Sequence, residues 1–304
     1  MAWRRESQEM ALNSLKPKYR DQDGFLMPMG FPAEHFQSAL KYKPAESDVF
    51  ITTYPKCGTT WMQYILYLLR NKGEPLPKGE KILHHVPHLE ESGAEVVAAL
   101  EEPRVIKTHL PKEMSPWNTN AKYIYVARNP KDCCTSMFHH TRNFGVHYDF
   151  VDGPFWAFFE CFVRGEVDFN CFFDNLNSWF AVKDLPNLLF LTYEEMKEDT
   201  AAVVRRLGEF LGGEFEKYAL DEAIVQKVVQ NSSLTSMKKS PENWTFSKND
   251  EFVRKGIIGD WRTTLSEMQS RRLDDRFREK CAGSEALHLW KSYGIPGEII
   301  EVED

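Results

Sequence analysis

Short runs of β-branched and aromatic residues alternate with amphipathic stretches along most of the 304-residue chain. Such runs predict strands, and stretches with an apolar residue every three or four positions predict helices. This alternation favours an α/β fold, with a mainly parallel central sheet flanked by helices and ligands at the carboxyl ends of the strands. The expected strands are Asp48–Thr53, Arg104–Thr108, Lys122–Ala127 and Leu188–Tyr193, and the expected helices are Thr59–Arg70, one from about Pro130, and a long one that follows Tyr193 and runs through Phe210.

Two stretches depart from the alternation. Residues 1–47 are interrupted by proline and glycine, and we expect them to form an irregular cover over the core. Residues 231–261 show little periodicity and carry several basic side chains, and a loop this long in a compact domain is usually functional or disordered. The same charges are compatible with a solvated surface. We expect a single domain over residues 1–304, although a chain of this length also allows two.

Composition narrows the range of partners. The net charge is −7 and no basic stripe dominates, so nucleic acid is not expected as a partner. The N-terminal sequence MAWRRESQEM lacks the apolar region of a signal peptide, and no apolar run approaches the ~20 residues that span a bilayer, so no membrane partner is expected. The cysteines show neither paired nor metal-ligand spacing, which favours reduced thiols, a cytoplasmic location and no bound metal. They are Cys57, Cys133, Cys134, Cys161, Cys171 and Cys281.

The segment Thr52–Trp61, TTYPKCGTTW, joins the first expected strand to its helix. Such a junction directs backbone N–H groups and a helix N-terminus toward one point, where Lys56, Thr59 and Thr60 add a cation and hydroxyl groups. This arrangement is typical of a phosphate or sulfate site. Because Lys56 precedes Gly58, the segment differs from the ATP-binding pattern GxxxxGK[ST]. For this segment alone, a hydroxyl-capped helix start without a ligand is the alternative interpretation.

Two further clusters follow the next two expected strands. Lys107 and His109 are two residues apart in an extended segment, so they share one face where the strand leaves the sheet. Histidine can take a proton near neutral pH, and lysine can stabilise negative charge beside it. Arg128 precedes the helix start at Pro130, and Ser136 lies two turns further on, which suits a second phosphate. Taken singly, the histidine also fits a structural role, and Arg128 fits pairing with a carboxylate.

Together, five motifs resemble those of the cytosolic sulfotransferases in order and spacing. They are YPKCGTTW, KTHLP, YVARNPKD with Ser136, LTYEEMKED, and RKGIIGDW at Arg254–Trp261. The resemblance extends from about Gly30 to the last helix. It implies a P-loop-like nucleotide-binding fold and an enzyme that uses 3′-phosphoadenosine 5′-phosphosulfate (PAPS) as donor. The sulfuryl group would pass to the hydroxyl or amine of a small molecule, with 3′-phosphoadenosine 5′-phosphate (PAP) as product and no metal required.

The resemblance also implies roles for individual residues. His109 would be the general base, Lys107 would hold the transferring sulfuryl group, and Lys56 would stabilise the departing oxygen. Residues 231–261 would form a cofactor-binding loop. The implied nucleotide contacts are Lys56, Cys57, Gly58, Thr59 and Thr60 for the 5′-phosphosulfate, Arg128, Ser136, Arg254, Lys255 and Gly256 for the 3′-phosphate, and Trp61, Tyr193, Ser232, Ser233, Leu234 and Met237 for the adenine.

The acceptor pocket is expected to be aromatic. Such a pocket suits a phenol or an aryl monoamine, and a steroid or an alcohol is also compatible with it. Histidine and acidic residues near the same segments favour the first two, because they can meet a polar tail. The candidate lining residues are Phe31, Phe36, His84, His85, Phe138, His140, Phe144, His147, Tyr148 and Phe246.

The chain departs from the family pattern at three places. Cys57 stands where the family usually has serine, and Leu234 stands where many members have a phenylalanine that stacks on adenine. Many members also carry a short dimer contact after Gly-Asp-Trp, of the form Lys-xxx-Thr-Val-xxx-Glu. Here the stretch carries Arg262, Ser266, Glu267 and Arg271, which break its apolar and acidic positions, so we expect a monomer or a weak dimer.

Three other classes of protein are alternatives. A small-molecule kinase with an unusual P-loop would need a lysine after the glycine and a strand-terminal aspartate for Mg²⁺, and neither is evident. A non-catalytic nucleotide-binding homologue is less compatible with the presence of Lys56, Lys107 and His109. A membrane-bound carbohydrate sulfotransferase would normally have an N-terminal anchor, and the sequence shows no such segment.

Overall fold

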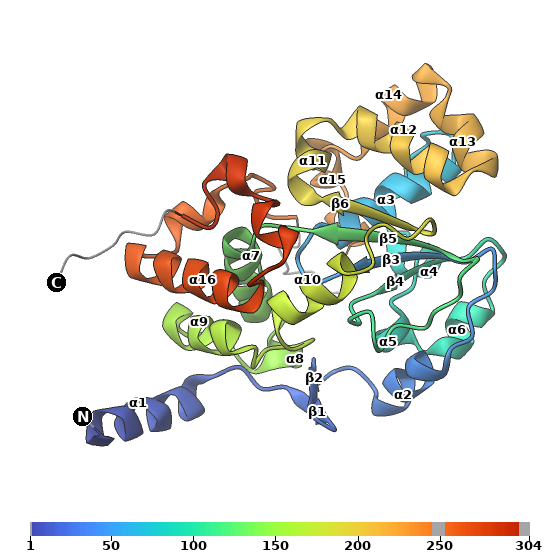
Figure 1. Ribbon diagram of the computed structural model, residues 1–304. Coiled ribbons are helices and arrows are strands. Elements are labelled where there is room, and N and C mark those ends of the chain that lie inside the picture. The colour runs from blue at the N-terminus through green and yellow to red at the C-terminus, as the bar shows by residue number, and fades with distance from the viewer. Residues whose placement is uncertain (1, 245–252, 298–304) are drawn as a thin grey trace.

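Within residues 2–244 and 253–297, which the computed structural model describes, four strands form a parallel sheet in the order β4-β3-β5-β6 (Figure 1). Thr53 pairs with Val126 and Ala127 pairs with Thr192, so the carboxyl ends of adjacent strands meet at one edge. The predicted α/β class is therefore confirmed. The strands are β3 (Val49–Thr53), β4 (Val105–Thr108), β5 (Lys122–Ala127) and β6 (Leu188–Thr192).

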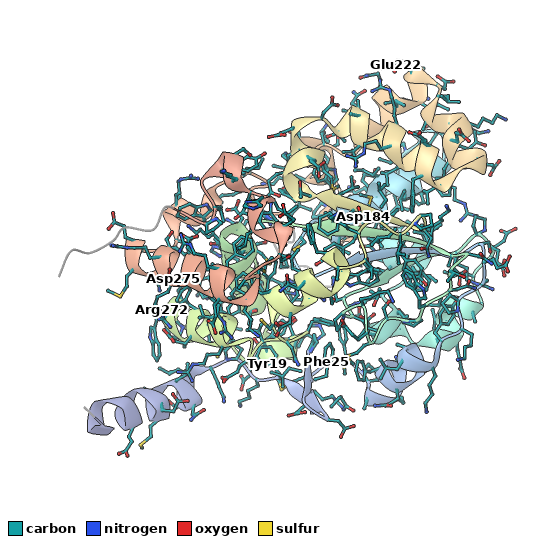
Figure 2. The ribbon with its side chains drawn as sticks, in the orientation of Figure 1. Tyr19, Phe25, Asp184, Glu222, Arg272 and Asp275 are labelled. Atoms are coloured by element: carbon teal, nitrogen blue, oxygen red, sulfur yellow. The ribbon has the colours of Figure 1, made fainter. Side chains whose placement is uncertain are left out.

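Both faces of the sheet are buried, because successive side chains of a strand point to opposite faces. Phe50 and Tyr123 stack on one face with ring centroids 4.9 Å apart, whereas Ile51 and Ile124 belong to the core on the other face. Helices cover both faces, and side chains fill the space between the layers (Figure 2). The first face packs against α7 (Pro130–Asn143), α9 (Phe155–Arg164), α10 (Phe172–Phe180) and α16 (Glu267–Lys280), and the second against α3 (Thr59–Arg70), α12 (Thr200–Leu211), α13 (Gly213–Ala219) and α14 (Glu222–Asn231).

The opening segment is more regular than the sequence predicted. Its prolines and glycines mark turns between elements rather than continuous irregular chain: Pro32, for example, is the N-cap of a helix that buries Phe36 and Ala39. The prediction of an irregular cover over residues 1–47 is therefore wrong. The elements there are α1 (Ala2–Leu15), an antiparallel hairpin of β1 (Arg20–Gln22) and β2 (Phe25–Met27), and α2 (Ala33–Lys41).

The long helix predicted after the fourth strand is in fact two helices. The first is α11 (Tyr193–Glu198), and α12 begins at Thr200. Asp199 separates them, since its non-helical backbone ends the first helix and its side chain accepts a hydrogen bond of 2.8 Å from Ala202 N. An aspartate N-cap competes in this way with continuation of a helix.

Residues 231–261 contain short helical turns rather than a structureless loop. The helix α14 ends at Asn231, and α15 (Leu234–Met237), η1 (Pro241–Asn243) and η2 (Asp260–Thr263) follow. Residues 245–252, which include Phe246 and Lys248, lie outside the described part of the chain. The remaining helical elements are α4 (Ile82–His85), α5 (Leu89–Ser92), α6 (Ala94–Ala98), α8 (Gly145–Tyr148), η3 (Glu285–His288) and η4 (Lys291–Tyr293).

Candidate active site

A cavity of about 620 Å³ lies at the carboxyl edge of the sheet. Its wall includes Lys56 after β3, His109 after β4, Arg128 after β5 and Tyr193 after β6. The segments that precede and follow these strands are far apart in sequence, and the parallel register brings them together. Every residue predicted to contact the nucleotide or to take part in catalysis lines this cavity, with the exception of Cys57.

Cys57 faces the protein interior instead. Its side chain is fully buried, and its sulfur lies 3.9 Å from the sulfur of Cys133 on α7. Burial is the main cause that raises the pKa of the Cys57 thiol well above its ordinary value. The thiol is therefore protonated and packed at neutral pH, and it is not among the cavity-lining groups. All six cysteines of the chain are buried free thiols.

The loop between β3 and α3 is shaped by two residues with positive φ. Lys56 has φ of 67°, and Gly58, the N-cap of α3, has φ of 98°. Gly58 supplies no side-chain cap, and the hydroxyl of Thr59 pairs instead with that of Thr53 at 2.6 Å. The alternative of a hydroxyl-capped helix start therefore does not describe this segment. The N-terminus of α3 meets the cavity in the manner of helix ends that bind phosphate groups.

Tyr193 holds the β3–α3 loop, Arg128 and Trp61 together. A Cβ added at Gly58 would lie 2.8 Å from Tyr193 Cδ2, so only glycine lets the ring approach the loop. The Arg128 guanidinium lies 4.4 Å from the centroid of the same ring, and Arg128 Nη1 donates a 3.0 Å hydrogen bond to the carbonyl oxygen of Lys56. The Trp61 ring packs edge-on at 5.6 Å. A single aromatic side chain thus fixes a cation, a ring and the loop at one end of the cavity.

The cavity concentrates positive charge. Burial, together with the neighbouring charges of Lys107, Arg128 and Arg254, lowers the pKa of Lys56 to about 7. Burial also lowers the pKa of Lys107, against an opposing effect of Glu91. A bound anion stabilises the charged form of buried lysines, so an arrangement in which Lys56, Lys107, Arg128 and Arg254 line one cavity suits a polyanionic ligand.

Arg254 and Lys255 reach the cavity from the segment before η2. Both pair with Asp260, at 2.5 Å for Arg254 Nη2 and 2.7 Å for Lys255 Nζ. The segment is anchored to α7 by Asp132, whose carboxylate accepts hydrogen bonds from Gly259 N at 2.7 Å and Trp261 N at 2.9 Å. The sequence assigned no role to Asp132 or Asp260. The contacts of Asp132 join segments that lie far apart in the chain, and those of Asp260 form where its own segment turns back on itself. Their carboxylates place the two cations at the cavity.

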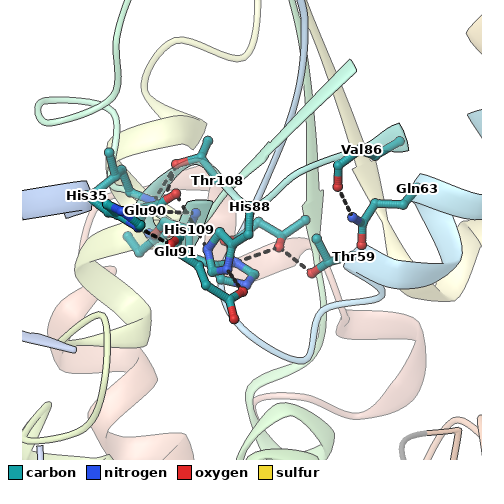
Figure 3. A network of polar contacts seen from close by, with 12 residues as sticks. His35, Thr59, Gln63, Val86, His88, Glu90, Glu91, Thr108 and His109 are labelled. Atoms are coloured by element: carbon teal, nitrogen blue, oxygen red, sulfur yellow. Dashed lines mark hydrogen bonds and ion pairs between the residues drawn. The ribbon is translucent and has the colours of Figure 1, made fainter. Parts of the chain in front are cut away.

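His109 is held in one orientation and one tautomer (Figure 3). Its Nδ1 lies 2.8 Å from the carbonyl oxygen of Thr53, which can only accept, so Nδ1 carries the proton and Nε2 keeps a free electron pair. Burial lowers the pKa of His109 well below its ordinary value, and the charges of Lys107 and His88 add to the effect. The ring is therefore neutral at pH 7 and able to accept a proton through Nε2.

A buried carboxylate on α5 fixes the backbone of His109. Glu90 Oε1 accepts hydrogen bonds from His109 N at 2.7 Å and from Thr108 Oγ1 at 2.9 Å, and Glu90 Oε2 lies 3.5 Å from His88 Nε2 (Figure 3). On the other side, Asn175 Nδ2 donates to the carbonyl oxygen of His109 at 3.2 Å. None of these supports was predicted, since no local pattern distinguishes Glu90 from an ordinary helical glutamate.

The other half of the cavity is lined by aromatic and ionisable side chains. Of the residues proposed for an acceptor pocket, Phe31, His140, Phe144, His147 and Tyr148 line it. Phe36, His84, His85 and Phe138 do not line it, and Phe246 lies outside the described residues. The sequence missed further lining residues that carry charge or aromatic surface, namely His88, Glu91, Asp168 and Phe169.

Comparison with known proteins gives one consistent result. A family model described as "Sulfotransferase domain" matches residues 46–285. Human sulfotransferase 1C2 is 32% identical, with 88% of this chain and 94% of the relative covered, and bovine sulfotransferase 1E1 is 32% identical, with 90% and 97% covered. The crystal structure of mouse sulfotransferase SULT7A1 complexed with PAP aligns with a TM-score of 0.76 at 28% identity, covering 91% of this chain and 98% of that one.

The chain therefore belongs to the sulfotransferase family, an enzyme family, and the resemblance drawn from five motifs is confirmed. Within the described ranges, no helix is long and apolar enough to cross a membrane. Across the same residues, no group of three or more histidine, cysteine, aspartate or glutamate side chains could hold a metal ion.

Proposed function

We propose that this protein transfers the sulfuryl group of PAPS to the hydroxyl or amine of a small acceptor and releases PAP. The observation that carries the proposal is the convergence of Lys56, Lys107, Arg128 and Arg254 on one cavity together with a neutral, buried His109. These side chains come from four separate stretches of the chain. Their convergence suits a doubly phosphorylated donor whose reactive end faces a base.

The donor occupies the part of the cavity next to α3. The loop from Lys56 to Thr60 binds the 5′-phosphosulfate, with Trp61 and Tyr193 against the adenine. A second group of residues binds the 3′-phosphate, which distinguishes PAPS from ATP. The proposal is supported by the cavity lining and by the PAP named in the structure of the mouse relative. The 3′-phosphate group comprises Arg128, Ser136, Arg254, Lys255 and Gly256, and the adenine contacts include Ser232, Ser233, Leu234 and Met237.

Transfer follows an in-line displacement. The acceptor oxygen forms a bond to sulfur, its proton passes to His109 Nε2, and the bond from sulfur to the phosphate oxygen breaks with its electron pair left on PAP. Lys56 stabilises the charge on the departing oxygen, and Lys107 holds the sulfuryl oxygens. A phenol has a pKa near 10, and even an ordinary histidine only about 6.5, so the proton moves during S–O bond formation rather than before it.

The acceptor is most compatible with a phenol or an aryl monoamine. The rings of Phe31, Phe169 and Tyr148 form apolar walls near the base, and the Phe169 ring centroid lies 4.9 Å from that of His109. Ionisable groups beside these walls suit an acceptor with a polar tail. A flat, aromatic acceptor therefore fits the surfaces that the cavity offers.

One experiment tests the proposed reaction against its alternatives. The purified protein is incubated with a panel of phenols, monoamines, steroids and alcohols and with either ³⁵S-labelled PAPS or γ-³²P-labelled ATP. Label that passes from PAPS to an acceptor supports the proposal. Label that passes from ATP would identify a kinase. Tight binding of PAP with no transfer to any acceptor would identify a non-catalytic nucleotide-binding homologue.

The depressed pKa of Lys56 predicts a pH dependence of nucleotide binding. In the free protein this pKa is about 7, so Lys56 loses its charge as the pH rises above 7. Binding of PAP favours the charged form and must then take up a proton, so affinity is expected to fall by up to about tenfold per pH unit above pH 7. The phosphates of PAP are already ionised there, because their second pKa is about 6.

Calorimetric titration with PAP between pH 7 and 9 measures this dependence. Arginine keeps its charge at these pH values, so Lys56→Arg is expected to flatten the pH profile. A slope that is the same in wild type and in Lys56→Arg would show that another group is responsible.

A further inference from the structure

A carboxyl group that the proposed reaction does not use lies in the acceptor half of the cavity. Asp168 is in the segment between α9 and α10 and is 2% exposed, yet it lines the cavity. Its Oδ2 accepts a 2.8 Å hydrogen bond from the hydroxyl of Tyr148. Its Oδ1 is buried and has no hydrogen-bond partner among the residues that the structure describes. An unsatisfied buried acceptor is unfavourable in the empty protein, and a ligand that donates to it removes that penalty.

Asp168 differs in this respect from Glu91, the other acidic side chain among the described cavity-lining residues. Glu91 also lines the cavity, but its Oε2 lies 3.4 Å from His88 Nδ1. Glu90 Oε1 accepts from the backbone of His109 and the hydroxyl of Thr108; Glu90 Oε2 has no hydrogen-bond partner in the described structure, but Glu90 does not line the cavity. Figure 3 shows these two glutamates gathered around His88 and His109, with their carboxylates engaged by protein groups. Of the two acidic side chains among the described cavity-lining residues, Asp168 is therefore the one with a buried oxygen that has no hydrogen-bond partner.

Its position suits the far end of a small aromatic acceptor. Phe169, the next residue, packs edge-on against the His109 ring with centroids 4.9 Å apart. Asp168 also lines the cavity, and the charge of His88, whose ring centroid lies 4.8 Å from that of His109, acts on its carboxyl, so the carboxyl lies on the same side of the site as the base. Phe31 and Tyr148 supply apolar surface along the same wall. An acceptor could thus place its hydroxyl group at His109, its ring against Phe169 and a polar tail at the Asp168 carboxyl.

We propose that Asp168 binds the ammonium group of a phenolic amine whose hydroxyl faces His109, and that it thereby selects amine-bearing acceptors. The assignment rests on the proposed sulfuryl transfer and specifies the acceptor of that reaction. Burial raises the pKa of Asp168 to about 7, and the nearby charges of Lys56 and His88 oppose this shift. A cation on Oδ1 stabilises the ionised carboxylate in the same way, and a buried charged pair of this kind discriminates strongly against an uncharged analogue.

Three acceptors that share one ring test the assignment. They are 4-(2-aminoethyl)phenol, 4-(2-hydroxyethyl)phenol and 4-ethylphenol, and kcat/KM is measured for each with saturating PAPS. The wild type is expected to prefer the amine. In Asp168→Asn, the ratio of kcat/KM for the amine to that for 4-ethylphenol is expected to fall by about 10- to 100-fold, the range for a hydrogen bond to a charged group. Because both kcat/KM values are measured on the same variant, a general loss of activity cancels in their ratio.

A matched control makes the same chemical change elsewhere. Asp184 is 88% exposed and pairs only with its neighbour Lys183 in the described structure, so Asp184→Asn is expected to retain the wild-type ratio. If Asp168→Asn does not fold, Asp168→Ser provides a second variant, because its hydroxyl can accept from Tyr148 without carrying a charge. PAP binding and thermal unfolding establish that each variant is folded.

The outcomes are distinguishable. A wild type that turns over 4-ethylphenol as well as the amine, or that prefers the hydroxyethyl compound, overturns the role of Asp168 and leaves the proposed reaction intact. An amine preference that survives in the folded Asp168 variants also overturns the role of Asp168. A wild type that transfers no sulfuryl group to any phenol overturns the proposed function and this assignment together. An amine preference that disappears only when Asp168 is replaced supports the assignment of Asp168 as the amine-binding residue.

Discussion

Replacement of His109 by alanine is expected to slow sulfuryl transfer by roughly 10²- to 10⁴-fold, the usual range for loss of a general base. The Nδ1 atom of His109 donates to the carbonyl oxygen of Thr53, so Nε2 is the atom available to the acceptor in the proposed reaction. With the pKa well below its ordinary value, the neutral ring is already the dominant form at pH 6.5. In the wild type, the rate is therefore expected to show no rise above pH 6.5 from titration of this residue.

Single-turnover measurements with saturating PAPS and a phenol check this prediction, since they exclude product release. PAP should still bind to His109→Ala, because the ring contributes no contact to the phosphates in the proposed arrangement. His288→Ala is a suitable control, as His288 is exposed on η3 and does not line the cavity. A transfer rate in His109→Ala within threefold of the wild type would remove His109 from the role of base.

The parts of the site that the sequence predicted are those that depend on local chain geometry. A strand, a turn and a helix start within ten residues bring Lys56 and Thr59 to the carboxyl edge of the sheet, and Lys107 and His109 share a face because they belong to one extended segment. Each of these relations is determined by spacing along the chain. Because the strands of the sheet are parallel, their carboxyl ends lie at the same edge and bring these residues together.

The parts that were missed depend on contacts between distant segments. Glu90 supports His109 from a short helix 19 positions earlier in the chain, and Asp132 holds Gly259 across 127 positions. Nothing in the neighbouring sequence distinguishes these carboxylates from solvated ones. The break at Asp199 was missed for another reason: apolar periodicity continues through it, and the capping interaction of one side chain decides the outcome locally.

The cationic side chains of the cavity are held in two different ways. Arg254 and Lys255 pair with Asp260, and this ion pair keeps them near the cavity when no nucleotide is bound. Burial and the nearby charges of Lys107, Arg128 and Arg254 instead lower the pKa of Lys56, whereas burial lowers the pKa of Lys107 against the opposing charges of Glu91 and Glu90. Binding of an anionic nucleotide would relieve this repulsion. The empty site is thus electrostatically unfavourable in the region where the reaction is proposed to occur.

Replacement of Gly58 by alanine is expected to weaken PAP binding by about 100-fold or more. A residue with a Cβ atom is strained by roughly 1–2 kcal/mol in a left-handed conformation, and overpacking adds about 1–3 kcal/mol. At Gly58 both effects apply, because φ is 98° and the new Cβ would lie 2.8 Å from Tyr193 Cδ2. In the proposed complex the loop adopts the geometry that strains the alanine, so binding of PAP would have to restore any strain that the free protein relieves. Each 1.36 kcal/mol then corresponds to a tenfold loss of affinity.

The added Cβ would also displace the ring of Tyr193, which contacts both Arg128 and Trp61. This displacement is expected to weaken PAP binding further. Gly79→Ala is the control for the destabilisation that any side chain causes at a positive φ. Gly79 has φ of 85°, lies outside the cavity lining, and has no atom within 4 Å of the added Cβ. That control is expected to lower the melting temperature slightly and to bind PAP as the wild type does. A PAP dissociation constant for Gly58→Ala within threefold of the wild-type value would mean that the loop binds the nucleotide without the close approach of Tyr193.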